Sequence, residues 1–121
     1  MKKQVVARLK GSSRNNLGHR FEVLRLIHAD HPSLPGHFPG APLVPGVVIL
    51  DEVVAAVDEW RRDSQLSGVR SVKFLAPLKP EQPFTISLFL ASKDAGEVTF
   101  CCRAGERVIV EGRLAVVWRA K

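Results

Sequence analysis

The sequence predicts an α+β fold in which one long buried helix is wrapped by a curved antiparallel sheet of about five or six strands. Residues 45–64 are apolar on nearly every helical face at their start, which indicates a buried helix. Residues 69–119 hold alternating apolar and polar positions separated by short turn signals. The 121 residues are 45% hydrophobic and 25% charged, so we expect a single globular domain over residues 1–121.

The first thirty residues contain a short segment, Gln4–Leu9, whose pattern fits either a strand or a helix. A polar stretch over residues 11–16 then predicts a loop. Phe21–Ile27 is predicted to be a strand, because Phe21, Val23 and Arg25 have the same parity.

Residues 32–46 contain five prolines and three glycines, which excludes a helix or a central strand. The segment also holds Leu34, Phe38, Leu43 and Val44, so it is not a solvated linker. A long segment without regular structure inside a compact domain is usually functional.

The helix is expected over residues 45–64, with Pro45 in its first turn and an ion pair between Asp58 and Arg62. Gly68 lies just beyond its expected end. A helix that is apolar on every side needs cover on every side, and a single sheet covers only part of it. The remaining cover must come from the proline-rich segment or from a second subunit.

The strands after the helix are expected at Val69–Ala76, at Phe84–Ala91, around residues 98–102 and at Arg107–Arg119. Val98, Phe100 and Cys102 should share one face. In the last strand, one face is expected to carry Val108, Val110, Leu114, Val116 and Trp118. Short turns between the last three strands predict an antiparallel meander.

The net charge of +6 favours an acidic partner. The basic residues are not interleaved with exposed aromatics, which argues against nucleic acid. No apolar run reaches the ~18 residues of a membrane span, and Val5–Ala7 is too short for a signal peptide, so we expect a cytoplasmic protein. The adjacent Cys101 and Cys102 are expected to be free thiols, and no metal site is expected.

The candidate chemistry lies in His37, Gly46 and Asp51. A histidine in a loop stiffened by prolines is a natural general base at neutral pH. The backbone N–H of Gly46 opens a helix and could polarise a carbonyl. Asp51 has apolar neighbours in the sequence and could act as an acid. However, Asp51 and Glu52 also lie on a polar arc with Asp58, Glu59 and Arg62, and a solvated stripe explains that pattern equally well.

Residues 37–51 begin with His-Phe-Pro-Gly, contain Pro-Gly at positions 45 and 46, and end at Asp51. This segment closely resembles the signature of the 3-hydroxyacyl-ACP dehydratases. The resemblance is sharp over residues 31–57. It implies the hotdog fold, a long helix wrapped by an antiparallel sheet, working as a homodimer or as a hetero-oligomer of hotdog subunits. It also implies a site shared between chains, in which His37 of one subunit meets an acid of the other, fourteen positions on.

In that family the position of Gly46 polarises the thioester carbonyl and the carbonyl at the position of Leu43 orients the imidazole. Phe38 and Val47 are expected to bind substrate beside them. Asp51 stands where many relatives have glutamate, and Glu52 next to it is the alternative acid.

The resemblance implies dehydration of a 3-hydroxyacyl thioester to a trans-2-enoyl thioester, in fatty-acid or aryl polyene biosynthesis. The substrate would be carried by the phosphopantetheine arm of an acidic acyl carrier protein, and the enzyme would need no cofactor of its own. Two alternatives are a non-catalytic acyl-carrier-binding subunit that pairs with an active homologue, and a thioesterase on the same fold.

Overall fold

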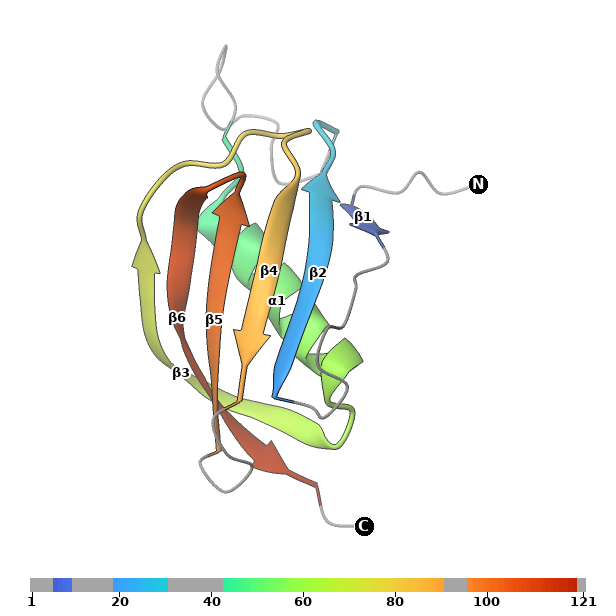
Figure 1. Cartoon of the computed structure of the whole chain (residues 1–121), viewed down its shortest axis with the longest axis vertical. Helices are drawn as coiled ribbons and strands as arrows, with labels where there is room; N and C mark the ends of the chain where they lie inside the picture. The colour runs from blue at the N-terminus through green and yellow to red at the C-terminus, as the bar shows by residue number, and fades with distance from the viewer. Residues whose placement is uncertain (1–5, 10–18, 31–42, 91–95, 120–121) are drawn as a thin grey trace.

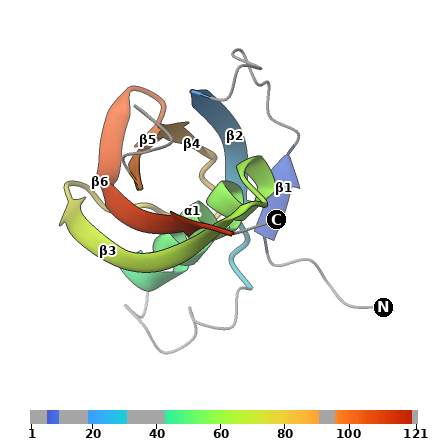
Figure 2. The same ribbon diagram turned by 90° about the horizontal axis from the view of Figure 1, so that it is seen from below.

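The computed structural model describes residues 6–9, 19–30, 43–90 and 96–119. One helix, α1 (Gly46–Trp60), packs against an antiparallel sheet with the strand order β1-β2-β4-β5-β6-β3. The strands are β1 (Val6–Leu9), β2 (Arg20–Ile27), β3 (Ser64–Phe74), β4 (Phe84–Phe89), β5 (Glu97–Ala104) and β6 (Arg107–Trp118). Figure 1 shows α1 lying across the sheet, and Figure 2 shows the strands curving around it. The predicted fold class is confirmed.

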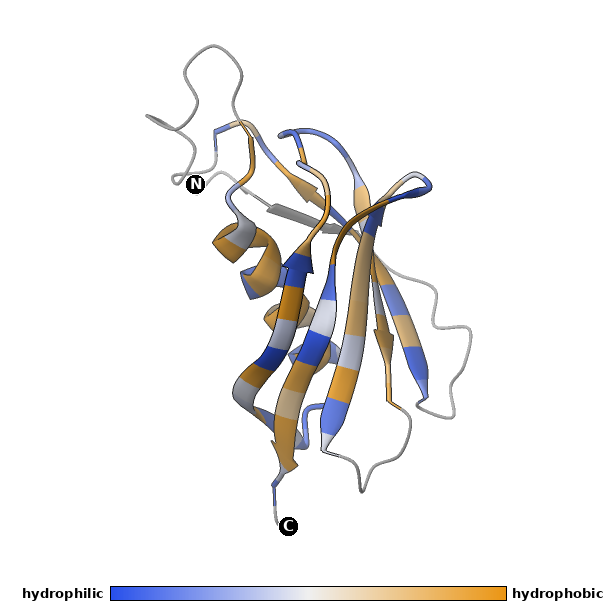
Figure 3. Cartoon of the chain, turned by 90° about the vertical axis from the view of Figure 1, so that its left-hand side faces the viewer, coloured by the Kyte–Doolittle hydropathy of each residue, from blue (hydrophilic) through white to orange (hydrophobic). Residues whose placement is uncertain are grey.

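The core fills the space between α1 and the concave face of the sheet. Alternate residues of β4 and β5 point into it, and Phe84, Ile86 and Phe100 are each at most 1% exposed. Val98 and Cys102 are buried on the same face as Phe100, as predicted. Figure 3 shows the resulting alternation of hydrophobic and hydrophilic residues along the strands. The meander is confirmed as well, because β4 pairs with β5 and β5 with β6, both antiparallel.

The helix is shorter than predicted, since it ends at Trp60 rather than at residue 64. The Arg61 N–H still donates to the Val57 carbonyl at 2.7 Å, but the Ser64 N–H and hydroxyl both donate to the Arg61 carbonyl, at 3.1 and 2.7 Å. This turn redirects the chain into β3, so the expected helical pair of Asp58 with Arg62 is wrong, because Arg62 lies outside the helix. Within the described ranges, no helix has both the length and the apolar character to span a membrane.

Strand β3 begins five residues earlier than predicted and is long enough to pair along most of β6. Gly68 does not follow the helix closely; it lies within β3, where the register with β6 shifts between Leu66 and Gly68. Glycine in a strand often marks such an irregularity. Strand β3 forms one edge of the sheet and β1 forms the other.

Strand β6 does not alternate strictly. Cys102 pairs with Val110 and Arg103 with Val108, so Ile109 is an extra residue on β6. Ile109 and Val110 are consequently both buried, at 1% and 0% exposure. The predicted face of Val110, Leu114 and Val116 is buried, whereas Val108 falls beyond the bulge and is only partly buried.

Candidate active site at the start of the helix

Four of the six predicted site residues lie in the described part of the chain: Leu43, Gly46, Val47 and Asp51. His37 and Phe38 fall outside the described residues. The site can therefore be built from the N-terminus of α1 and the surfaces around it.

The first turn of α1 has no side-chain cap. Pro45 precedes the helix with φ −60° and ψ 143°, and it offers no side-chain acceptor to the first amides. The first turn contains no acidic residue either. The amides at this end carry the positive end of the helix dipole and suit a polarised carbonyl or an oxyanion. This arrangement is consistent with the role predicted for the Gly46 N–H.

Gly46 is packed against the ring of Phe74, the last residue of β3. A Cβ built at Gly46 would lie 2.5 Å from Cε1 and 2.7 Å from Cζ of that ring. Any side chain at this position would force the Phe74 ring to move, so glycine is what allows the ring to lie against the start of α1. Phe74 is 56% exposed and Val47, one residue into the helix, is 63% exposed.

The approach to the helix is held by the connection between β3 and β4. The Val44 N–H donates to the Leu78 carbonyl at 2.9 Å, and Val44 and Leu78 are 7% and 1% exposed. Leu43 beside them is half-buried. This backbone contact fixes the position of Gly46 relative to the sheet.

Asp51 points away from the sheet. It lies on the outward face of α1 with Val47, four residues before it, and Val54, Ala55 and Asp58 after it. Together with the first residues of β3 and Arg119, these helix residues from Asp51 onward line a groove of about 580 Å³. Asp51 is exposed, so its apolar neighbours in the sequence do not bury it within one chain. Val53 is 0% exposed, but it packs inward on the opposite side of the helix.

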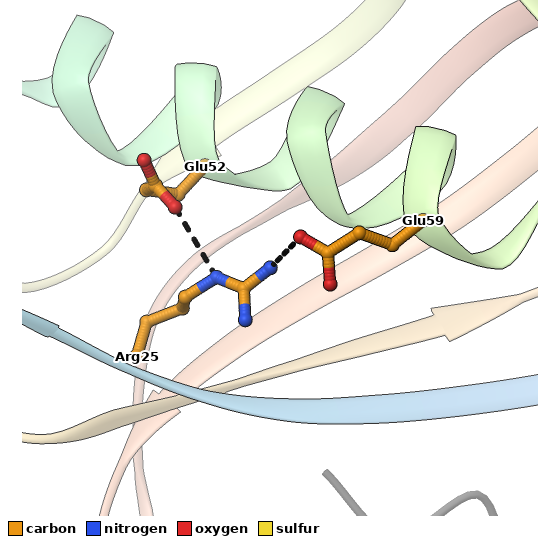
Figure 4. Close-up of polar contacts among 3 residues, drawn as sticks. All are labelled: Arg25, Glu52 and Glu59. Atoms are coloured by element: carbon orange, nitrogen blue, oxygen red, sulfur yellow. Dashed lines mark hydrogen bonds and ion pairs between the residues drawn. The ribbon is translucent and has the colours of Figure 1, made fainter. Parts of the chain in front are cut away.

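Glu52, the next residue, points into the core. The buried Arg25 of β2 donates from Nε to Glu52 Oε1 at 3.2 Å and from Nη2 to Glu59 Oε2 at 2.6 Å. Arg25 is 1% exposed and Glu52 is 4% exposed. Figure 4 shows the guanidinium lying between the two helix carboxylates. The interpretation that Glu52 belongs to a solvated polar stripe is therefore wrong, because its carboxylate is buried and forms an ion pair with Arg25.

Sequence reasoning missed the role of Arg25. Its parity with Val23 was visible, and Ile27 continues the same buried face. The matching signal on the helix was the spacing of Glu52 and Glu59, which are seven residues apart and therefore lie on one side two turns apart. An arginine on the buried face of a strand needs an acidic partner, because a buried charge is costly unless it is paired. Two carboxylates on one side of the helix are the candidates for that partner.

The two cysteines are free thiols in the structure, as expected. Burial raises the pKa of the Cys102 thiol to about 12. Burial also raises the pKa of Cys101, which is partly exposed. Neither thiol is activated as a nucleophile. Among the described residues, no group of three or more histidine, cysteine or acidic side chains is arranged to hold a metal ion.

Comparison with known proteins matches residues 13–113 to the family model of ApeI-like proteins, described as ApeI dehydratase. The chain is 33% identical over 103 residues to the 3-hydroxyacyl-acyl-carrier-protein dehydratase FabZ of Chlamydia trachomatis serovar L2, covering 75% of this chain and 67% of that protein. It is 27% identical over 112 residues to the FabZ of Syntrophotalea carbinolica, covering 84% and 76%.

Among solved structures, the chain superposes on the dehydratase heterocomplex ApeI:P from Xenorhabdus doucetiae with a TM-score of 0.79 at 20% identity. The superposition covers 91% of this chain and 96% of that one. The shared fold defines a hotdog protein. The family match then makes the assignment specific: the chain belongs to the ApeI-like dehydratase family.

Proposed function

We propose that the protein dehydrates a 3-hydroxyacyl thioester carried on acyl carrier protein to the trans-2-enoyl thioester. The observation that supports this most strongly is the contrast between Asp51 and Glu52. Glu52 is held by Arg25, whereas Asp51 lies on the open side of α1, beside the groove and less than two turns from the uncapped helix start at Gly46. Membership of the dehydratase family supports the same assignment.

In the proposed reaction His37 removes the C2 proton, and the electron pair of that bond forms the C2=C3 double bond. The Gly46 N–H stabilises the negative charge that develops on the thioester oxygen. The partner subunit's Asp51 gives its proton to the C3 hydroxyl, which leaves as water as the C3–O bond breaks. Proton return from His37 to the aspartate, directly or through solvent, restores both groups. No electrons are transferred to an acceptor, so we propose that the reaction needs no redox cofactor, and an acid and a base suffice without a metal.

We propose that the site is shared between two hotdog subunits. The outward face of α1 supports this, because Val47 is 63% exposed and Asp51 faces away from the chain's own sheet. A second subunit over this face would cover the apolar residues and bring Asp51 to the other chain's His37. The partner is a second copy or a related hotdog subunit, as in the heterocomplex of the Xenorhabdus neighbour.

The proposed substrate carrier is an acidic acyl carrier protein, whose phosphopantetheine arm holds the acyl chain. The net charge of +6 supports this choice, since opposite charges steer association. Fatty-acid synthesis and aryl polyene synthesis are both pathways that would supply such a substrate.

The test is to incubate the purified protein with a 3-hydroxyacyl thioester on acyl carrier protein, and to follow enoyl absorbance and free thiol separately. We expect enoyl absorbance, and we expect the His37→Ala variant to lose it. Release of thiol without enoyl product would instead identify a thioesterase.

A non-catalytic acyl-carrier-binding subunit is the second candidate, favoured by the likeness to a heterocomplex. In that case the protein alone would give neither product. Enoyl absorbance would then appear only when an active hotdog homologue is added, and the His37→Ala variant would support that activity as well as the wild type does.

A further inference from the structure

The connection between β3 and β4, residues 75–83, contacts the chain on both sides of residues 31–42. On the helix side, the Leu78 carbonyl accepts the Val44 N–H at 2.9 Å. On the strand side, the Glu81 N–H donates to the carbonyl of Ile27, the last residue of β2, at 2.8 Å. One short connection therefore anchors both the chain that leaves β2 and the chain that enters α1.

The side chain of Glu81 adds further bonds at the end of β2. Its Oε2 accepts the Ala29 N–H at 2.7 Å, and the same carboxylate lies 3.2 Å from His28 Nδ1. The bond from the Ala29 N–H is the main cause that lowers the pKa of Glu81, so the carboxylate stays ionised to a lower pH than that of an ordinary glutamate. A charged acceptor makes a stronger hydrogen bond than a neutral one.

The backbone of Glu81 shows that this position suits glycine. Its φ is +64°, and it is the one non-glycine residue with positive φ among those the structure describes. Glycine adopts this conformation readily, whereas residues with a Cβ do so at a cost. Glu81 therefore adopts a backbone conformation that is unfavourable for a residue with a Cβ. Compared with a glycine at this position, it provides a carboxylate that accepts the Ala29 N–H.

The turn itself does not depend on that carboxylate. The Lys79 N–H donates to Gln82 Oε1 at 3.1 Å, and the Gln82 N–H donates to the Lys79 carbonyl at 3.3 Å. These bonds close the turn locally. The bonds of the Glu81 side chain instead reach a different part of the chain, the residues that follow β2.

We propose that Glu81 is a positioning residue for the catalytic base. Glu81 bonds the backbone at Ala29 and Leu78 bonds it at Val44, so one connection anchors the described residues on both sides of the segment that contains His37. The inference rests on the proposed function, because it assigns the benefit of this anchor to proton removal by His37. A base held away from its attack position loses rate steeply.

The test compares Glu81→Gly, Glu81→Gln and Gln82→Ala with the wild type. Glu81→Gly removes the carboxylate while relieving the positive φ, so thermal stability should be unchanged or higher. We expect its kcat to fall about tenfold with little change in KM, because positioning and not substrate affinity is lost. Glu81→Gln keeps an acceptor oxygen and should recover much of the rate. Gln82→Ala, which opens only the local turn, should keep the wild-type kcat.

A second measurement does not depend on activity. Hydrogen exchange followed by mass spectrometry should show faster exchange in peptides spanning residues 28–45 of Glu81→Gly than in those of the wild type. Equal exchange in these peptides would overturn the inference, as would faster exchange with an unchanged kcat. If the wild type has no dehydratase activity, the proposed function fails, while faster exchange would still support the anchor.

Discussion

The two sides of α1 differ in how far a single chain completes them. The inward side is closed: Val53 and Ala56 are 0% exposed, and the buried Arg25 of β2 is bonded to Glu52 and Glu59. The outward side is open, with Val47 exposed and Asp51 facing a groove. Two adjacent carboxylates, Asp51 and Glu52, therefore have opposite surroundings because 100° of helical rotation separates them.

The same division occurs on β5, where Cys101 and Cys102 are neighbours on opposite faces of the sheet. Cys102 is 0% exposed in the core, and Cys101 is partly exposed on the outer face. In both elements, neighbouring residues differ in burial because one faces the core and the other faces away from it, so the outward side of α1 is the surface on which the proposed partner and chemistry depend. Substitutions on the two sides of α1 should therefore have different effects, on activity and association on the outward side and on stability on the inward side.

The largest effect is expected at Asp51. Asp51→Asn keeps the shape of the side chain and removes the proton that it donates, so dehydratase activity should fall by about 10²–10⁴. That loss corresponds to roughly 3–5 kcal/mol of activation free energy. Asp58→Asn changes another exposed carboxylate about 10 Å further along the same helix face and should leave kcat close to the wild-type value.

The shared site gives this prediction a second form. Mixing His37→Ala with Asp51→Asn protein should restore activity, because a mixed dimer holds one site with both groups intact. If the subunits are shown to exchange and no activity returns, the two groups do not act across the interface.

On the inward side we expect a loss of stability in place of a loss of chemistry. Arg25→Met removes the guanidinium that Glu52 and Glu59 share, and breaking a buried ion pair from one side costs about 3–5 kcal/mol of unfolding free energy. Urea denaturation at fixed protein concentration measures it. Arg103→Met is the matched control, because Arg103 is exposed and lies 3.9 Å from Glu22, and it should cost about 0–1 kcal/mol.

The double variant Arg25→Met with Glu52→Met sharpens the same comparison. Replacing both charges by apolar side chains of similar size should recover part of the lost stability, since neither charge is then buried alone. If the double variant is less stable than Arg25→Met, the ion pair is not the source of the stability that Arg25 provides.

The fold could be predicted largely from periodicity, because the alternation in β4 and β5 and the apolar turns of α1 directly reflect burial. The details that failed were set by tertiary contacts. The helix stops at Trp60 because Ser64 caps the Arg61 carbonyl and pairs with Trp118, and neither bond is visible in the local pattern. The extra residue Ile109 in β6 likewise depends on pairing with β5, and it changes which residues before it face the core.

For the site, the sequence motif predicts that Asp51 is the acid and leaves Glu52 as the alternative, and that assignment stays a prediction. Periodicity placed both on one polar arc, and only the position of Arg25 beneath the helix separates them. The contact of Phe74 with Gly46 and the bonds of Glu81 to the end of β2 join residues distant in the sequence, so no local pattern could have predicted them.

The open face of α1 predicts self-association through Val47. Val47→Lys places a charge where we expect the partner to pack, and a two-fold dimer loses two buried valines, roughly 3 kcal/mol at about 1.5 kcal/mol each. That loss corresponds to about a hundredfold weaker association, which sedimentation velocity over a concentration series can measure. Phe89→Lys is the control, because Phe89 is 45% exposed at the end of β4, away from the helix. Equal weakening by both variants would contradict a dimer built on α1.

The smallest effect is expected from the inward-facing Cys102 at alkaline pH. Burial raises its pKa to about 12 in the folded protein, while the thiol of the unfolded chain ionises near pH 9.0. Between these values the unfolded state releases the proton and the folded state keeps it, so stability should fall as pH rises above 9. At pH 10 the loss is roughly 1 kcal/mol relative to neutral pH. Cys102→Ala should lack this loss, although the smaller side chain lowers its stability at every pH.

Comparing the two proteins at pH 8 and pH 10 by urea denaturation isolates the thiol, because the other titrating groups are common to both, and the sequence contains no tyrosine. If the stability difference between the two proteins is the same at both pH values, Cys102 is not protected from ionisation by the core.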